Sequence, residues 1–163
     1  MPGAVLHVSG ERFDPNDVLP SLALLPYRVW RRGESVAPTG PSSKRIYESG
    51  GFSCVVSRAD GLLAAEASDA LAFLTEHRVA LASLRDYAAV DDVRIDFGHY
   101  LRIDNALVTV QVDSLGPELL RLAGELGVGF EFSLYPAPAP ASQDDVVDDS
   151  VTMNETEAPR LDT

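Results

Sequence analysis

Hydrophobic and polar residues alternate most regularly between Asp92 and Ile103, where every second residue from Val93 onward can face a core. This period of two predicts a strand that is buried on one face. Asp104 and Asn105 then form a turn signal, and the alternation resumes over Ala106–Val112. We therefore predict an antiparallel hairpin whose second strand points these side chains inward: Ala106, Val108, Val110 and Val112.

A third alternating segment covers Val128–Tyr135 and predicts a strand with these inward positions: Val128, Phe130, Phe132 and Leu134. The helix that we expect before it has Ser114 as N-cap, Pro117 in its first turn and Gly127 at its C-terminus. Its apolar stripe is formed by Leu119, Leu122, Ala123 and Leu126.

Apolar residues keep helical spacing over Leu62–Tyr87, although the stripe weakens around His77. This predicts either two helices or one bent helix. In the first third of the chain, Asp14 and Pro15 are typical of the start of a helix, which Pro20 keeps short. The remaining expected elements are strands at Val5–Ser9, Arg28–Arg31 and Phe52–Ser57, and a loop at Pro38–Ser43.

The predicted order is β-α-β-β-α-β-β-α-β. Strands that are apolar on one face and joined through helices favour an α+β fold with ferredoxin-like elements, in which helices cover one face of a mainly antiparallel sheet. We expect this single domain to span residues 1–135. From Pro136 to Thr163 a Pro/Ala-rich run is followed by acidic and small polar residues, which predicts a disordered tail.

The chain has 163 residues, 45% of them hydrophobic, and its formal net charge is −12. Half of that charge lies in the tail, which has seven acidic residues and one basic residue. Such acidity argues against nucleic-acid binding. No apolar run is long enough for a membrane helix, and no signal-like segment opens the sequence, so we expect a cytoplasmic protein without a membrane partner.

Candidate catalytic groups are few. The histidines are His7, His77 and His99, and their spacing matches no common metal motif, so we predict neither a metal site nor a cofactor. The single cysteine, Cys54, falls at an inward strand position, where a free cysteine behaves as a small hydrophobic residue. The chain lacks a nucleophile elbow, a phosphate loop and a dinucleotide motif, and we assign no catalytic residue.

Two groups of residues are candidate binding sites. Trp30, Arg31, Arg32 and Glu34 are of types that anchor protein interfaces, or Trp30 covers the core while an arginine pairs with Glu34. The uncovered face of the sheet is expected to present Arg94, Tyr100, Arg102 and Tyr135, beside Gln111 and Glu131, either as a docking surface or as an ordinary solvated face.

The opening motifs, Ser9–Val18, Leu24, Pro26 and Val29–Glu34, resemble an uncharacterised bacterial domain family. The end of the domain, from Leu126-Gly127 to Phe132-Ser133-Leu134-Tyr135, is similar to the same family. Some members resemble immunity-type proteins of bacterial toxin systems. The resemblance implies a small binding protein without established enzymatic activity.

We therefore expect a non-enzymatic, immunity-like protein that occludes a protein partner such as a toxin. The alternative is a small-molecule-binding or enzymatic module with a pocket near Trp30, Arg31 and Tyr47. The oligomeric state is left open by the sequence.

Overall fold

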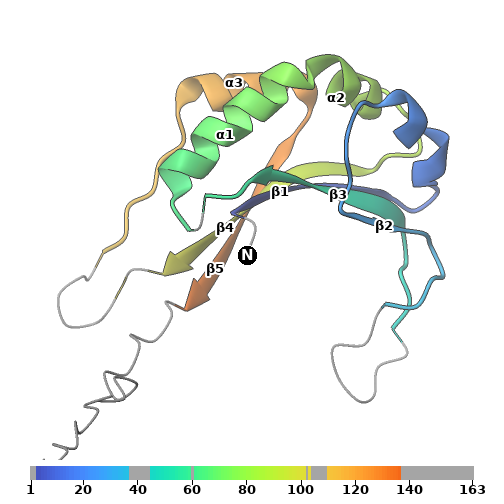
Figure 1. The fold of residues 1–163 in the computed structure, drawn as a ribbon, viewed down its shortest axis with the longest axis horizontal. Helices are drawn as coiled ribbons and strands as arrows, with labels where there is room; N and C mark the ends of the chain where they lie inside the picture. The colour runs from blue at the N-terminus through green and yellow to red at the C-terminus, as the bar shows by residue number, and fades with distance from the viewer. Residues whose placement is uncertain (1–2, 37–44, 60, 102, 104–109, 137–163) are drawn as a thin grey trace, which may run out of the picture.

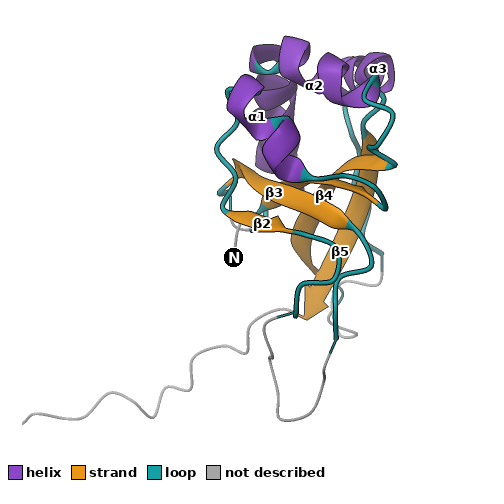
Figure 2. Ribbon diagram, turned by 90° about the vertical axis from the view of Figure 1, so that its right-hand side faces the viewer, coloured by secondary structure: helices purple, strands orange, loops and turns teal. Residues whose placement is uncertain are grey.

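A five-stranded sheet in the order β2-β3-β1-β4-β5 carries helices on one face (Figures 1 and 2). The computed structural model describes residues 3–36, 45–59, 61–101, 103 and 110–136. The strands are β1 (Ala4–Gly10), β2 (Arg28–Trp30), β3 (Gly50–Ser57), β4 (Asp92–Leu101) and β5 (Gly129–Pro136). All neighbouring strands are antiparallel except β4 and β5, which are parallel. The predicted α+β class is confirmed.

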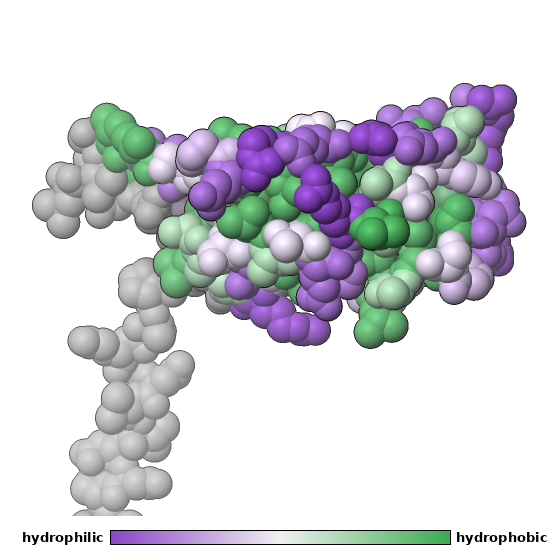
Figure 3. Space-filling model, turned by 90° about the horizontal axis from the view of Figure 1, so that it is seen from above, coloured by the Kyte–Doolittle hydropathy of each residue, from purple (hydrophilic) through white to green (hydrophobic). Residues whose placement is uncertain are grey.

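Three α-helices form the layer above the sheet: α1 (Leu63–Glu76), α2 (Arg78–Arg85) and α3 (Pro117–Leu126). The first two are separated at His77, so the weak point in the apolar stripe marks a break between two helices. Hydrophilic side chains lie over much of the helix side of the molecule, with hydrophobic groups between them (Figure 3).

The core lies between the helices and the inner face of the sheet. Leu6 in the central strand β1 is opposite Cys54 on β3 and Ile95 on β4, and all three side chains are buried. Along β4, buried and partly exposed residues alternate from Asp92 to Tyr100, as the period-two pattern predicts. The helices close the core with Leu74, Leu81, Leu84, Leu119 and Leu126.

Short 3-10 helices connect β1 to β2: η1 (Pro15–Asp17) and η2 (Leu19–Ser21). The side chain of Asp14 accepts a hydrogen bond from the backbone N–H of Asn16 at 2.9 Å, which confirms Asp14 as a cap. Prolines at 15 and 20 each lie in the first turn of one of these short helices, because a proline deeper in an α-helix would lose a backbone hydrogen bond.

The predicted strand Ala106–Val112 is tested by the structure only at its end, residues 110–112, and that end is not a strand. The neighbours of β4 are β1 and β5, and residues 110–116 contain no strand. Val110 and Val112 are strongly exposed instead of pointing inward. The alternating pattern describes which faces of a segment are apolar, but β5 occupies the place beside β4 that a hairpin partner would take. The described residues therefore contain five strands where six were predicted, and residues 104–109, which include most of the sixth, lie outside the described residues.

Two further predictions concern α3 and β5. Gly127 ends α3 in the left-handed conformation with φ 68°, as expected for a C-terminal glycine. The N-cap is Gly116 instead of Ser114, and no side chain caps the helix. Phe132 and Leu134 share the inner face with Phe97 and His99 by register, but they are not buried, because the carboxyl ends of β4 and β5 curve away from the helices (Figure 1).

The predicted loop at Pro38–Ser43 and the predicted tail after Pro136 lie outside the described residues. Within the described part of the chain, no helix has the length and apolar character that crossing a membrane requires.

Candidate functional site

Trp30 lies on the outer face of the sheet, away from the helices. Its register partner on β3 is Gly51, and a Cβ at that position would lie only 2.3 Å from Cζ2 of Trp30. The indole also stacks on the ring of Tyr47, with 5.6 Å between the ring centroids and 28° between the planes. The glycine therefore makes the space in which the indole rests on the backbone of β3.

Arg28 completes this aromatic group. Its guanidinium carbon lies 5.9 Å from the ring centroid of Trp30 and 5.6 Å from that of Tyr47. A guanidinium N–H also donates to the hydroxyl of Tyr47. Among the residues that the structure describes, no carboxylate pairs with Arg28, and its guanidinium instead lies against the two aromatic faces. We call Arg28, Trp30 and Tyr47 the aromatic stack.

Several exposed apolar side chains lie close in sequence to the residues of the aromatic stack. They are Leu25, Tyr27, Val29 and Ile46. Beyond Trp30, an antiparallel bridge between Ser35 and Ile46 pairs the segment that follows β2 with the segment that precedes β3. Because β2 is the first strand in the sheet order, its outer edge has no neighbouring strand within the described residues. The stack therefore lies beside an open strand edge.

Arg31 and Glu34 form the turn that follows the aromatic stack. The backbone N–H of Arg31 donates to Glu34 at 2.8 Å, and the arginine side chain lies 3.5 Å from Glu34 and 3.6 Å from Asp14. Hydrogen bonding from the backbone of Asn16, supported by the charge of Arg31, lowers the pKa of Asp14. The expected pairing of an arginine with Glu34 is therefore present, together with a partner that the sequence analysis did not name.

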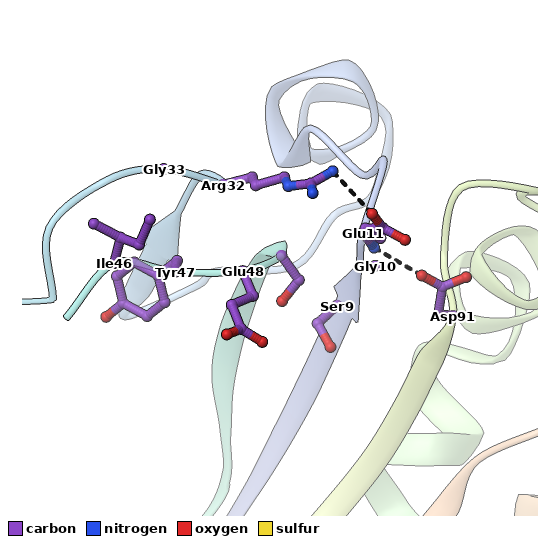
Figure 4. Close-up of a pocket in the computed structure, with 10 residues that line it drawn as sticks. Ser9, Gly10, Glu11, Arg32, Gly33, Ile46, Tyr47, Glu48 and Asp91 are labelled. Carbon is purple, nitrogen blue, oxygen red and sulfur yellow. Dashed lines mark hydrogen bonds and ion pairs between the residues drawn. The ribbon is translucent and has the colours of Figure 1, made fainter.

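Arg32 projects to a different place, an open cleft of about 690 Å³ at the end of β1 and the start of β3 (Figure 4). It pairs with Glu11 at 3.1 Å, and the backbone N–H of Glu11 donates to Asp91 at 2.7 Å. Glu48 and Tyr47 also line the cleft. Neither Trp30 nor Arg31 is among the lining residues, and the cleft shares only Tyr47 with the aromatic stack.

Arg94 belongs to a third group, on the outer face of β4 and β5. Its guanidinium lies between Asp92 and Glu131, at 2.5 Å from Glu131, and these carboxylates raise the pKa of Arg94. Next to it, the hydroxyl of Ser133 donates to Asp96 at 2.9 Å. This arrangement confirms that the polar positions of β4 share the uncovered face, and it ties Arg94 into an ion-pair network.

The other residues expected on that face are separate from this network. The ring of Tyr100 lies against Gly61, where a Cβ would be 2.6 Å from it. Tyr135 is opposite Tyr100 in the parallel register and is partly exposed. Arg102 lies outside the described residues. The structure thus brings together Trp30 with Arg28, and Arg94 with Glu131, but it leaves the two groups on different strands of the sheet.

A contact that sequence reasoning missed joins His7 of β1 to Ser53 of β3, with 2.9 Å between Nδ1 and the hydroxyl oxygen. Burial and the charge of Arg94, which is the register partner of His7 on β4, lower the pKa of His7. Alternation would have placed both side chains on the outer face, but only the strand order shows that they are neighbours. Ser53 is 1% exposed, which leaves its hydroxyl without access for a substrate.

Cys54 is 2% exposed, and burial raises its pKa to about 11. A thiol with so high a pKa is protonated at neutral pH and is a poor nucleophile. Among the described residues, no group of three or more His, Cys, Asp or Glu side chains is arranged to hold a metal ion.

A comparison with protein families finds that residues 2–137 match the model of a domain of unknown function, DUF4279. No curated protein and no solved structure matches the chain.

Proposed function

We propose, for a chain that belongs to the domain family of unknown function DUF4279, a non-enzymatic role in which the domain binds a protein partner and occludes its active surface. The observation that carries this proposal is the aromatic stack of Arg28, Trp30 and Tyr47 beside an open strand edge. The immunity-type proteins that some relatives resemble act by this kind of occlusion, with a toxin as the partner.

The composition of the aromatic stack supports a protein interface. Trp, Tyr and Arg are the residue types in which binding energy concentrates at such interfaces. Arg28 has no carboxylate partner among the described residues, so a partner carboxylate or carbonyl oxygen can pair with it without breaking an existing ion pair. The edge of β2 also offers backbone groups to which an extended segment of the partner can add.

Charge supports a basic partner. The chain has a formal net charge of −12, which attracts a basic protein over distances of about a Debye length and accelerates encounter. Arg31 and Arg32 are neutralised locally by carboxylates, so they do not reverse this attraction. We therefore expect association to be faster at low salt, and the affinity to depend mainly on the aromatic stack.

The buried nucleophiles support a role without catalysis. The hydroxyl of Ser53 and the thiol of Cys54 are both inaccessible in the folded domain. Each would need both exposure and an activating base to attack a substrate.

Affinity purification of the full chain from its native host, at low and high salt, tests this function. Proteins that co-purify are then produced separately and titrated against the purified chain. We expect Trp30→Ala to weaken binding by roughly tenfold or more, as at interface hot spots. Val79→Ala, at an exposed position on α2, is the matched control and should bind like the wild type. A purified partner that binds Trp30→Ala as tightly as wild type contradicts the proposed surface, and the absence of any partner at either salt contradicts the function.

The cleft beside the stack supports a second candidate, a small-molecule site. Its volume of about 690 Å³ suffices for a metabolite, and Arg32, Glu48 and Tyr47 offer charge and an aromatic ring. A thermal-shift screen with metabolites tests it, because a ligand that binds only the folded state raises the melting temperature. Stabilisation that disappears in Arg32→Ala would support this candidate, and a uniformly flat screen would remove it.

A further inference from the structure

A separate pocket opens at the opposite side of the sheet, where β4 and β5 extend past the helices. Its volume is about 400 Å³. The apolar walls are formed by Leu101, Ile103, Phe132 and Leu134, and the polar lining residues are His99, Gln111 and Asp113. The strands curve away from the helix layer at this end, which leaves their inner face without helical cover (Figure 1). The pocket shares no residue with the aromatic stack or with the cleft that contains Arg32.

The apolar walls are unusually exposed for positions on the inner face of a sheet. Phe132 is 47% exposed and Leu134 is 56% exposed, although both lie in register beside inner-face residues of β4. Apolar surface gathered in a concave site is a common property of ligand pockets, because a ligand that covers it removes it from water. The walls therefore favour an occupant with an apolar body.

His99 supplies a polar group in this apolar setting. Its side chain is 5% exposed, and its Nδ1 is buried without a hydrogen-bond partner among the described residues. The Nε2 atom lies 3.5 Å from Asp113, which also lines the pocket. A buried N–H without an acceptor costs more than a ring nitrogen that carries no proton, which favours the tautomer with the proton on Nε2. His99 therefore presents one N–H donor on the side of Asp113.

The contact between Nε2 and Asp113 is too long to be a strong hydrogen bond, because such bonds have N···O distances near 2.9 Å. A ligand oxygen can therefore accept from Nε2 at a shorter distance. The carboxylate of Asp113, which accepts a hydrogen bond from Gln111 at 2.6 Å, lies beside this position and disfavours a second negative charge, so the oxygen should belong to an uncharged group. The donor, the adjacent negative charge and the apolar walls together define the chemistry of the occupant.

We propose that this pocket binds an uncharged, mainly apolar small molecule whose carbonyl or hydroxyl oxygen accepts a hydrogen bond from Nε2 of His99. This site is independent of the protein partner proposed above, since it uses other residues and another side of the sheet. Loss of either activity would leave the other one intact.

The fluorescent ketone 6-propionyl-2-(dimethylamino)naphthalene, titrated with the purified full-length chain, tests the proposal. It is uncharged, it carries one carbonyl group, and its emission shifts to shorter wavelength in apolar surroundings. We expect saturable binding with one site per chain. Leu134→Lys should abolish the shift, because it places a charge in the apolar wall, while Leu120→Lys, at a half-exposed position on α3, should leave it unchanged.

Three competitors then separate the parts of the proposal. We expect 2-acetylnaphthalene, a neutral ketone, to displace the probe, 2-ethylnaphthalene to displace it less well, and 2-naphthoate, an anion, to fail. His99→Leu should weaken the ketone by roughly threefold to tenfold, the usual effect of one lost hydrogen bond, and leave 2-ethylnaphthalene unaffected. This difference distinguishes a lost donor from a general loss of packing.

Several results would overturn the site. They are binding that does not saturate, equal displacement by all three competitors, or an unchanged probe signal in Leu134→Lys. Sedimentation of the probe-free chain provides a further test. A dimer that Leu134→Lys dissociates would show that a second copy of the chain covers the pocket instead of a small molecule.

Discussion

The indole of Trp30 rests on the backbone of β3 at Gly51, where a Cβ would lie 2.3 Å from the indole and 2.5 Å from the carbonyl oxygen of Val8. Gly51 is therefore crowded from both sides, by the indole of Trp30 on β2 and by the carbonyl group of Val8 on β1, and only glycine fits between them. In this position the indole also stacks on Tyr47 and lies within 5.9 Å of the guanidinium carbon of Arg28.

We expect Gly51→Ala to lower the free energy of unfolding by about 1–3 kcal/mol, the usual cost of overpacking a close contact. Urea denaturation followed by tryptophan fluorescence measures both the stability and the surroundings of the single tryptophan. Gly124→Ala is the matched control, because it lies in α3 with no atom within 4 Å of its added Cβ. The control should be neutral or stabilise the protein by up to about 1 kcal/mol. Equal stability in the two variants would contradict this account of Gly51.

His7 predicts a pH dependence of stability. Burial, with the charge of Arg94, lowers the pKa of His7 below 6.5 in the folded state, while the unfolded chain keeps its ordinary value. Between these two pKa values the unfolded state binds more protons, so the free energy of unfolding decreases as the pH falls below 6.5. Above that pH the histidine is neutral in both states and contributes no slope.

Urea denaturation of wild type and His7→Gln, as a matched series between about pH 4.5 and about pH 8, measures this contribution, because these limits bracket the ordinary histidine pKa. We expect the difference in stability between the two proteins to be constant above about pH 7 and to change in favour of the variant below it. A difference that stays constant across the whole series would show that the pKa of His7 is not lowered by folding.

Cys54 should be inert in the folded protein. With a pKa of about 11, its thiolate fraction near pH 8 is lower by about two orders of magnitude than that of an ordinary cysteine, and its burial excludes reagent as well. We expect a thiol-specific disulfide reagent to react slowly with the native chain and rapidly in concentrated urea. Rapid reaction of the native chain at a rate typical of free cysteine would refute both the burial and the raised pKa.

Removal of residues 137–163 should leave the stability of the domain nearly unchanged. This prediction follows from the composition of that segment, which contains few large apolar residues to bury. The truncated chain keeps all of β5, including Pro136, which is opposite Leu101 in the parallel register. Calorimetry of both chains measures the effect, and a fall in melting temperature of more than about 4 °C, equivalent to about 1 kcal/mol, would show that the segment binds to the domain.

Local pattern was enough to predict several elements. The alternation along β4 correctly assigns its buried face, and the weak apolar stripe at His77 marks where α1 ends and α2 begins. Asp14 as a cap and Gly127 at the end of α3 follow from the chemistry of those residues alone. Each of these features depends on residues that are close together in the sequence, which is why the sequence alone predicts them.

The candidate sites depended on neighbours in space. Nothing local pairs Trp30 with Gly51 or His7 with Ser53, because these contacts follow from the order β2-β3-β1-β4-β5. The sequence suggested a binding role for Trp30 and an ion pair between an arginine and Glu34, but it did not predict the cleft at Arg32 or the pocket at His99.

Periodicity and capping act over a few residues, so the amino-acid pattern was enough to predict the α+β class, the apolar faces of the strands and the glycine that ends α3, but not the N-cap of α3. Only the tertiary structure decided that β5 lies parallel to β4, in the place that the hairpin was expected to fill. A period of two specifies which face of a strand is apolar, whichever strand pairs with it. The choice of the neighbouring strand depends on how the whole chain packs. That choice left Phe132 and Leu134 exposed at the end of the sheet, and with them the pocket at His99.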